Sequence, residues 1–190
     1  MQQTSPLLAF RPTVLVLASG RGERFRASGG AVHKLQALLG GTAVLERTLA
    51  AVRESGLPWH LEQAAHPGMG DAIAAAVRVT PNPQGWLILP ADLPLIRPQS
   101  LLHVAERLER GTQAAVVPWV AGRPAHPVGF AASAGPQLMV LRGDEGARSV
   151  LHGLRALHMV DDIILDDPGA VADVDTLADL AAAERLLSGG

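Results

Sequence analysis

The chain has 190 residues, a formal net charge of -2 and a hydrophobic content of 48%, which together indicate a globular protein of one domain, residues 1–190. The near-neutral charge and an aromatic content of 3% argue against a nucleic-acid partner, since such partners need basic surfaces or stacking side chains. Because cysteine is absent, the chain has neither disulfides nor a thiolate nucleophile.

No stretch of the sequence is long and apolar enough to cross a membrane, and residues 1–12 carry no signal-peptide pattern. Two prolines and the lack of hydrophobic periodicity make residues 1–12 a loose lead-in. We therefore expect a cytoplasmic protein without a membrane partner.

Apolar runs alternate with segments of helical periodicity along most of the chain. Strands are predicted at residues 13–18, 59–63, 86–89, 114–119 and within 158–165. Residues 21–31, rich in glycine and charge, are predicted to be a long, mobile loop. Helices are predicted at residues 42–55 with Thr42 as N-cap, and at 71–79, 98–110, 137–141, 149–154 and 177–187, the last with Thr176 as N-cap. This alternation predicts a three-layer α/β domain with a mainly parallel sheet.

The strand at residues 13–18 runs into Ala18-Ser19-Gly20-Arg21-Gly22, a loop of mostly small residues that we call the phosphate loop after its predicted role. Its backbone N–H groups can converge on an anion because few side chains crowd them. Arg24 and Lys34 add positive charge, and Lys34 is the only lysine of the chain. A compact ammonium group on a flexible stem suits a phosphate that changes shape during a reaction. The spacing matches neither a Walker loop nor a dinucleotide-binding loop, so we predict a nucleoside triphosphate site of another kind.

Carboxylates follow or precede regular elements at two other places. Asp92 comes just after the strand at residues 86–89, and Asp173 and Asp175 precede the last predicted helix. Ligands of parallel sheets bind outside the carboxyl ends of the strands, so we expect these groups to meet the phosphate loop at one edge. Mg²⁺ prefers one or two carboxylates together with phosphate and water oxygens. We predict an Mg²⁺ site at Asp92 that Asp173 or Asp175 completes; N-capping of the last helix is an alternative, compatible role for Asp175.

Two polar, glycine-rich loops at residues 122–127 and 142–148 could hold a second, anionic substrate. The side chains concerned are Arg123, His126, Asp144 and Arg148, for which a solvated surface position is the alternative. Five other histidines have neither metal-ligand spacing nor a nucleophile partner, and we expect them to be structural: His60, His66, His103, His152 and His158.

Several motifs occur in one order along nearly the whole chain. They are Leu17-Ala18-Ser19-Gly20-Arg21-Gly22-Glu23-Arg24-Phe25 with Lys34-Leu35, Pro90-Ala91-Asp92-Leu93-Pro94, Gly122-Arg123-Pro124-Ala125-His126-Pro127, Gly143-Asp144-Glu145-Gly146-Ala147-Arg148 and Asp173-Val174-Asp175-Thr176. Together they resemble the MobA/MocA-like nucleotidyltransferases, part of the glycosyltransferase-A-like group that includes sugar-1-phosphate nucleotidyltransferases. The resemblance implies a Rossmann-like, glycosyltransferase-A-like α/β/α domain with a mainly parallel, mixed sheet.

The resemblance also implies roles for individual residues. Nucleotide binding falls to Leu17, Ala18, Ser19, Gly20, Arg21 and Gly22, and to Gly68 and Asp71 of a base- and ribose-contacting loop. Arg24 and Lys34 would neutralise the β- and γ-phosphates, while Asp92 and Asp175, with Asp173 as the rival, would hold Mg²⁺. A phosphate oxygen of the acceptor would attack the α-phosphorus in line and expel pyrophosphate. The implied acceptor is molybdopterin, bound near His126, Asp144 and Arg148.

The chain departs from the family pattern at two places. Ser19 stands where the family has a second glycine or alanine; its Cβ brings it closer to the alanine form of the CTP users than to the double-glycine form of the GTP users. Between Gly56 and Trp59, one βα unit of the family is missing. Two alternatives to transfer onto molybdopterin stay open: transfer to a sugar or polyol phosphate, and a non-catalytic nucleotide-binding protein that assists a molybdoenzyme or its maturation.

Overall fold

A seven-stranded mixed sheet forms the middle layer of the molecule in the computed structural model, which describes residues 11–189. Its strands are β1 (Thr13–Leu17), β4 (Trp59–Glu62), β5 (Trp86–Pro90), β6 (Ala115–Val120), β7 (Arg123–Pro124), β8 (Val128–Phe130) and β9 (Val160–Ile164). The order is β4-β1-β5-β8-β6-β7, and β9 pairs with β6. The pairs of β1 with β4 and β5, and of β6 with β9, are parallel, whereas β8 runs antiparallel to β5 and β6.

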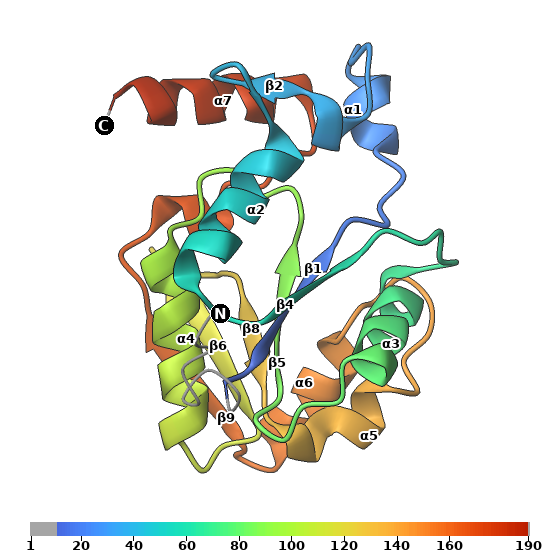
Figure 1. The fold of residues 1–190 in the computed structure, drawn as a ribbon, viewed down its shortest axis with the longest axis vertical. Coiled ribbons are helices and arrows are strands. Elements are labelled where there is room, and N and C mark those ends of the chain that lie inside the picture. The colour runs from blue at the N-terminus through green and yellow to red at the C-terminus, as the bar shows by residue number, and fades with distance from the viewer. Residues whose placement is uncertain (1–10, 190) are drawn as a thin grey trace, which may run out of the picture.

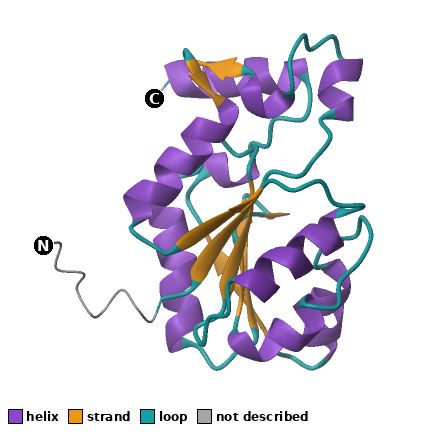
Figure 2. Cartoon of the chain, turned by 45° about the vertical axis from the view of Figure 1, so that its right-hand side comes forward, coloured by secondary structure: helices purple, strands orange, loops and turns teal. Residues whose placement is uncertain are grey.

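Helices cover both faces of this sheet (Figures 1 and 2). On one face lie α2 (Val44–Ser55) and α4 (Pro98–Arg110); on the other lie α3 (Met69–Val79), α5 (Gly135–Leu138) and α6 (Arg148–Ala156). Side chains of β1 alternate between the two cores: Val14 and Val16 pack on one side, Leu15 and Leu17 on the other. A strand buried on both faces needs the continuous apolar run seen in the sequence. The predicted three-layer fold is confirmed.

The remaining elements gather beyond the carboxyl end of β1, at the top of Figure 1. They are α1 (Glu23–Ala27), the hairpin of β2 (Leu38–Leu39) and β3 (Thr42–Ala43), and α7 (Leu177–Ser188). Short 3-10 helices lie at Lys34–Gln36, Ala132–Ala134 and Pro168–Val171. Thr176 caps α7 as predicted, because its side chain accepts from the N–H of Asp179 while the Asp179 carboxylate accepts from the N–H of Thr176.

Some predicted boundaries were wrong. Residues 21–31 contain helix α1, which is held to the protein by the buried ring of Phe25; a single apolar residue gives no periodic signal. Thr42 does not cap α2, because it pairs with Leu39 in the hairpin and Ala43 takes the N-cap position. Helix α3 begins at Met69, two residues before its predicted start at residue 71. Helix α5 spans Gly135–Leu138 instead of the predicted residues 137–141. The predicted lead-in at residues 1–12 lies largely outside the described residues.

The short connection after α2 has a clear consequence for the sheet. Helix α2 leads through residues 56–58 directly into β4, which pairs in parallel with β1 and forms an end of the sheet order. With this short connection, β4, which pairs with β1, is an edge strand of the sheet. Among the described residues, no helix has the length and apolarity to cross a membrane.

Candidate active site

A cleft of about 780 Å³ opens at the carboxyl ends of β1 and β5, beneath the cap formed by α1 and the segment before α7. This is the edge of an α/β sheet at which ligands bind. Sixteen of the seventeen predicted site residues line it: Leu17, Ala18, Ser19, Gly20, Arg21, Gly22, Arg24, Lys34, Gly68, Asp92, Arg123, His126, Asp144, Arg148, Asp173 and Asp175. Only Asp71 is not part of the lining. The phosphate loop, the loops at residues 122–127 and 142–148 and the three carboxylates therefore line one cavity, although they are far apart in the sequence.

The phosphate loop is held from two sides. At its start, the N–H of Ala18 donates to the carbonyl of Glu62 on β4. Further on, Gly22 has a φ of 63°, in the left-handed region that glycine tolerates, and an added Cβ would lie 3.0 Å from the ring of His33. His33 Nδ1 accepts from the N–H of Leu35, so Nε2 carries the proton and donates to the carbonyl of Gly20 at 2.9 Å. No local sequence pattern predicts this contact between His33 and Gly20.

Lys34 bridges two carboxylates across the cleft. Its Nζ lies 2.5 Å from Asp92 Oδ2 and 2.7 Å from Asp175 Oδ1, and all three side chains are mostly buried. Arg24 Nη1 contacts the other oxygen of Asp175 at 2.7 Å. Burial alone would lower the pKa of Lys34, but the charges and hydrogen bonds of Asp92 and Asp175 outweigh it and raise that pKa above its ordinary value. Lys34 is therefore fully charged at neutral pH.

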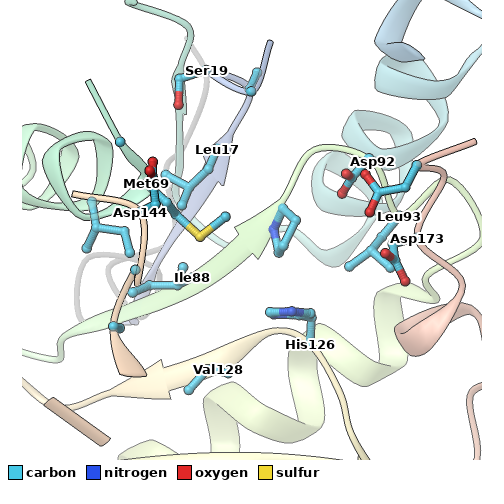
Figure 3. A pocket seen from close by; sticks show the side chains of 18 of the residues that line it. Leu17, Ser19, Met69, Ile88, Asp92, Leu93, His126, Val128, Asp144 and Asp173 are labelled. Atoms are coloured by element: carbon cyan, nitrogen blue, oxygen red, sulfur yellow. The ribbon is translucent and has the colours of Figure 1, made fainter. Parts of the chain in front are cut away.

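Asp173 occupies a different position from Asp175. Asp173 as a whole is exposed at the cleft, although its carboxyl group is partly shielded from water. This shielding, together with the negative charges of Asp92 and Asp175, raises the pKa of the carboxyl. The segment is fixed in place because the N–H of Val174 donates to the carbonyl of Asp92 at 3.0 Å. Figure 3 shows Asp92 and Asp173 side by side at one end of the cleft. This end carries three carboxylates from two segments of the chain.

These carboxylates fit a hard cation. Asp92 Oδ1 is buried and has no hydrogen-bond partner within residues 11–189, so it retains a free lone pair for a ligand. No cluster of three or more histidine and acidic side chains in that range has the geometry of a complete metal site. Mg²⁺ does not need one, since it takes one or two carboxylates and fills its shell with phosphate and water oxygens.

His126 lies in the middle of the cleft, on the segment between β7 and β8 where the pairing with β6 is interrupted. Val116 pairs with Gly129 and Trp119 pairs with Pro124, so two residues of β6 lie opposite the four residues 125–128. The extra residues form a bulge, a common device for aiming a side chain at an active site. Burial lowers the pKa of His126 despite the opposing effect of Asp92, so the imidazole is neutral, and its buried Nδ1 has no partner among the described residues. Figure 3 shows its ring between the Asp92 end and Ile88.

The far end of the cleft is a close backbone contact between two loops. The N–H of Gly70 donates to the carbonyl of Gly143 at 2.7 Å, and a Cβ on Gly68 would lie 2.3 Å from the carbonyl carbon of Gly143. Asp144 and Met69 lie together there, away from Asp92 (Figure 3). The loops predicted to bind nucleotide and acceptor thus form one wall.

Asp71 does not take its predicted place in the cleft. Its carboxylate accepts from the N–H of Gly143 at 2.8 Å and lies outside the cleft lining. The first turn of α3 therefore uses this side chain to anchor the 142–148 loop. A helix-start aspartate gives the same sequence signal whether it points to a ligand or to a neighbouring loop.

His66, expected to be structural, lines the cleft beside Pro67 and Gly68. Its Nε2 lies 3.2 Å from Glu62 Oε1, and His60 Nε2 lies 3.6 Å from the other oxygen. Burial alone would raise the pKa of Glu62, but the N–H of Ala64 and the two histidines together lower it. A carboxylate at the end of edge strand β4 thus supports the cleft wall.

We predict that Glu62→Gln destabilises the protein at neutral pH by about 1–2 kcal/mol, because it removes a buried, hydrogen-bonded charge. A lowered folded-state pKa means that this stabilisation is present above the ordinary value of 4.5 and is lost as the pH falls through the folded value. Urea unfolding of both proteins at pH 7 and pH 3 measures the difference. A difference that stays constant with pH would contradict the assignment.

A glycine-rich loop and carboxylates facing each other at the carboxyl edge of a mainly parallel sheet define an α/β protein of the nucleotide-dependent transferase class. Residues 50–160 match the family described as MobA-like NTP transferase domain. The chain belongs to this family of nucleotidyltransferases, as the sequence resemblance predicts. The matched range contains Asp92 and His126, while the phosphate loop and Asp175 lie outside it.

Individual proteins are also similar to this chain in sequence or in fold. The bifunctional protein GlmU of Gloeobacter violaceus is 28% identical over 149 residues, which are 65% of this chain and 31% of GlmU, so the chain spans about a third of that relative. Rv0371c from Mycobacterium tuberculosis H37Rv has a TM-score of 0.76 at 23% identity over 93% of this chain and 98% of its own. Its complex with manganese has a TM-score of 0.72 at 22% identity over 93% and 99%.

The molybdopterin-guanine dinucleotide biosynthesis protein A from Archaeoglobus fulgidus has a TM-score of 0.60 at 20% identity, over 94% of this chain and 100% of its own. Like the resemblance to Rv0371c, this one is below 25% identity and shows the fold alone. The full-length coverage extends the α/β assignment beyond the family match, to the segments that carry the phosphate loop and Asp175.

Proposed function

We propose that residues 1–190 act as one domain that transfers a nucleoside monophosphate from CTP to a phosphorylated acceptor, molybdopterin, with Mg²⁺ as cofactor. The observation that carries the proposal is the phosphate loop and Lys34 facing Asp92 and Asp175 across a single cleft. A triphosphate held by that loop brings its α-phosphorus toward the carboxylate end. An acceptor of this kind implies a cytoplasmic reaction and a molybdoenzyme, or a protein of its maturation, as downstream partner.

The chain's own residues account for most of the proposed mechanism. Backbone N–H groups of residues 18–22 bind and orient the phosphates, and Arg24 and Lys34 offset the charge that gathers on the departing pyrophosphate. The acceptor is an anionic phosphate, so its oxygen attacks the α-phosphorus without a base; the new P–O bond forms as the bond to the β-phosphate oxygen breaks. Neutral His126 can hydrogen-bond the acceptor without changing the charge of the site.

Asp92 and Asp175 would hold the Mg²⁺, with Asp173 as a further ligand. When bound, such an ion neutralises phosphate charge and stabilises the transition state. The manganese complex of Rv0371c supports a divalent cation in a protein of this fold.

The proposal is tested by pyrophosphate release with each of CTP, GTP, ATP and UTP in the presence of Mg²⁺ and molybdopterin, with mass spectrometry of the dinucleotide product. Release with CTP and molybdopterin supports it. Release only with a sugar phosphate or a polyol phosphate would replace the acceptor, and tight nucleotide binding with no release for any pair would favour the non-catalytic accessory protein.

Ser19 provides a test of the base preference. Ser19→Gly is expected to lower the ratio of kcat/KM for CTP over GTP by roughly tenfold, the effect of one lost or altered pocket contact. Ser19→Ala is the matched control, because it keeps the Cβ and should keep the preference for CTP. Equal ratios in the wild type and in Ser19→Gly would remove this residue from base selection.

A further inference from the structure

The carboxylates of Asp92 and Asp175 already bind a positive charge of the protein itself, the ammonium group of Lys34. Lys34 Nζ contacts one oxygen of Asp92 at 2.5 Å and one of Asp175 at 2.7 Å. The remaining oxygen of Asp175 contacts Arg24, and the remaining oxygen of Asp92 is buried without a partner among residues 11–189. A position shared by two carboxylates is the position that a bridging divalent ion takes, and here an ammonium group fills it.

A second cation at this place would meet a like charge at short range. The side chains of Lys34, Asp92 and Asp175 are 12%, 14% and 15% exposed, so water screens their interactions weakly. A divalent ion and the ammonium would therefore repel each other if both stayed between the carboxylates. Metal binding to the pair requires that Lys34 moves away.

Neighbouring contacts hold the backbone of Lys34, whereas its ammonium group sits at the end of a stem with several rotatable bonds. The next residue, Leu35, is buried in the core, and the preceding one, His33, is bonded to the carbonyl of Gly20 in the phosphate loop. The ammonium group is thus tethered to the loop by a flexible four-carbon stem. A triphosphate in that loop offers it an alternative anionic partner without a change of fold.

We propose that Lys34 occupies the metal position in the nucleotide-free protein and that a bound triphosphate draws the ammonium away and so opens the position to the divalent ion. The inference rests on the proposed metal and triphosphate sites and adds their coupling. Nucleotide and metal then bind with positive cooperativity, and linkage requires that each raises the affinity for the other by the same factor. Metal alone binds weakly because it must first displace Lys34.

Mn²⁺ titrations followed by electron paramagnetic resonance, without acceptor and without turnover, test this coupling. In the nucleotide-free protein, Lys34→Met is expected to raise the Mn²⁺ affinity by roughly tenfold, and Lys34→Arg, which keeps the charge, is expected to leave it low. Arg26→Met is the control: it removes one charge from the same segment, but Arg26 contacts the carbonyl of Arg21 and not the carboxylates. A non-hydrolysable triphosphate analogue should raise the Mn²⁺ affinity of the wild type and much less that of Lys34→Met.

An unchanged Mn²⁺ affinity in Lys34→Met, or an equal effect of the nucleotide on both proteins, overturns the proposal. Should Lys34→Met be poorly folded because its carboxylates now repel, thermal melts decide: Mn²⁺ should raise its Tm more than that of the wild type, and an equal or smaller rise again overturns the proposal. A protein that binds Mn²⁺ in this pattern but releases no pyrophosphate would refute the proposed reaction and leave the coupling intact.

Discussion

Asp92→Asn is expected to lower kcat by at least about a hundredfold while the fold remains intact, because it removes one charge from the metal and phosphate end of the cleft. Asparagine has nearly the same shape and keeps one oxygen, so the loss reports charge rather than volume. Asp92 also neutralises the buried ammonium of Lys34, and some loss of stability accompanies the change. Pyrophosphate release at saturating nucleotide, together with circular dichroism melts, separates the two effects.

The control for Asp92→Asn is Asp161→Asn. Asp161 lies on strand β9, pairs with Arg107 of α4 at 2.7 Å and does not line the cleft. It loses the same charge by the same substitution, so its kcat should stay near the wild-type value. Near-normal turnover in Asp92→Asn would mean that the metal is held elsewhere and would exclude the proposed carboxylate pair.

Gly169→Ala is expected to reduce the free energy of unfolding by about 3 kcal/mol, the upper part of the range for overpacking. Gly169 lies in the buried turn at Pro168–Val171, and an added Cβ would be 1.9 Å from the carbonyl oxygen of Leu95 and 2.8 Å from the nitrogen of Ile96. These are backbone atoms that no rotamer change can move. Urea unfolding measures the loss.

The same substitution should also impair the active site. The carbonyl of Ala170 accepts from the N–H of His126, and the chain continues from that turn to Asp173 and Asp175. A shift of the turn therefore moves two walls of the cleft, and Mn²⁺ affinity should fall in the fraction that stays folded.

Gly153→Ala is the matched control for this position. Gly153 lies inside α6, and an added Cβ there would have no atom within 4 Å. Replacing a helical glycine by alanine stabilises by about 0.5–1 kcal/mol, so the two alanine variants are expected to have opposite signs. If Gly169→Ala were as stable as the wild type, the turn would not be the fixed support described above.

Local patterns in the sequence were enough for the class of fold and for most of the cleft. The apolar run before Ala18 is typical of a strand buried on both faces, and the small residues after it favour an open loop. Because ligand sites of such sheets lie at the carboxyl ends of the strands, the sequence alone predicts that Asp92 lies near the phosphate loop. These inferences hold because burial and turn formation depend on neighbouring residues.

The contacts between distant segments were decided by the tertiary structure alone. Lys34 is 58 residues from Asp92 and 141 from Asp175, and nothing in the local sequence says that the ammonium bridges both carboxylates. Asp71 stands at the start of a predicted helix, where a ligand-binding role was expected, but its carboxylate accepts from the N–H of Gly143. No sequence pattern predicts a site role for His66, yet it lines the cleft. Hydrophobic periodicity reports which face of an element is buried, whereas the partner of a polar side chain depends on how strand order and loop closure bring remote segments together.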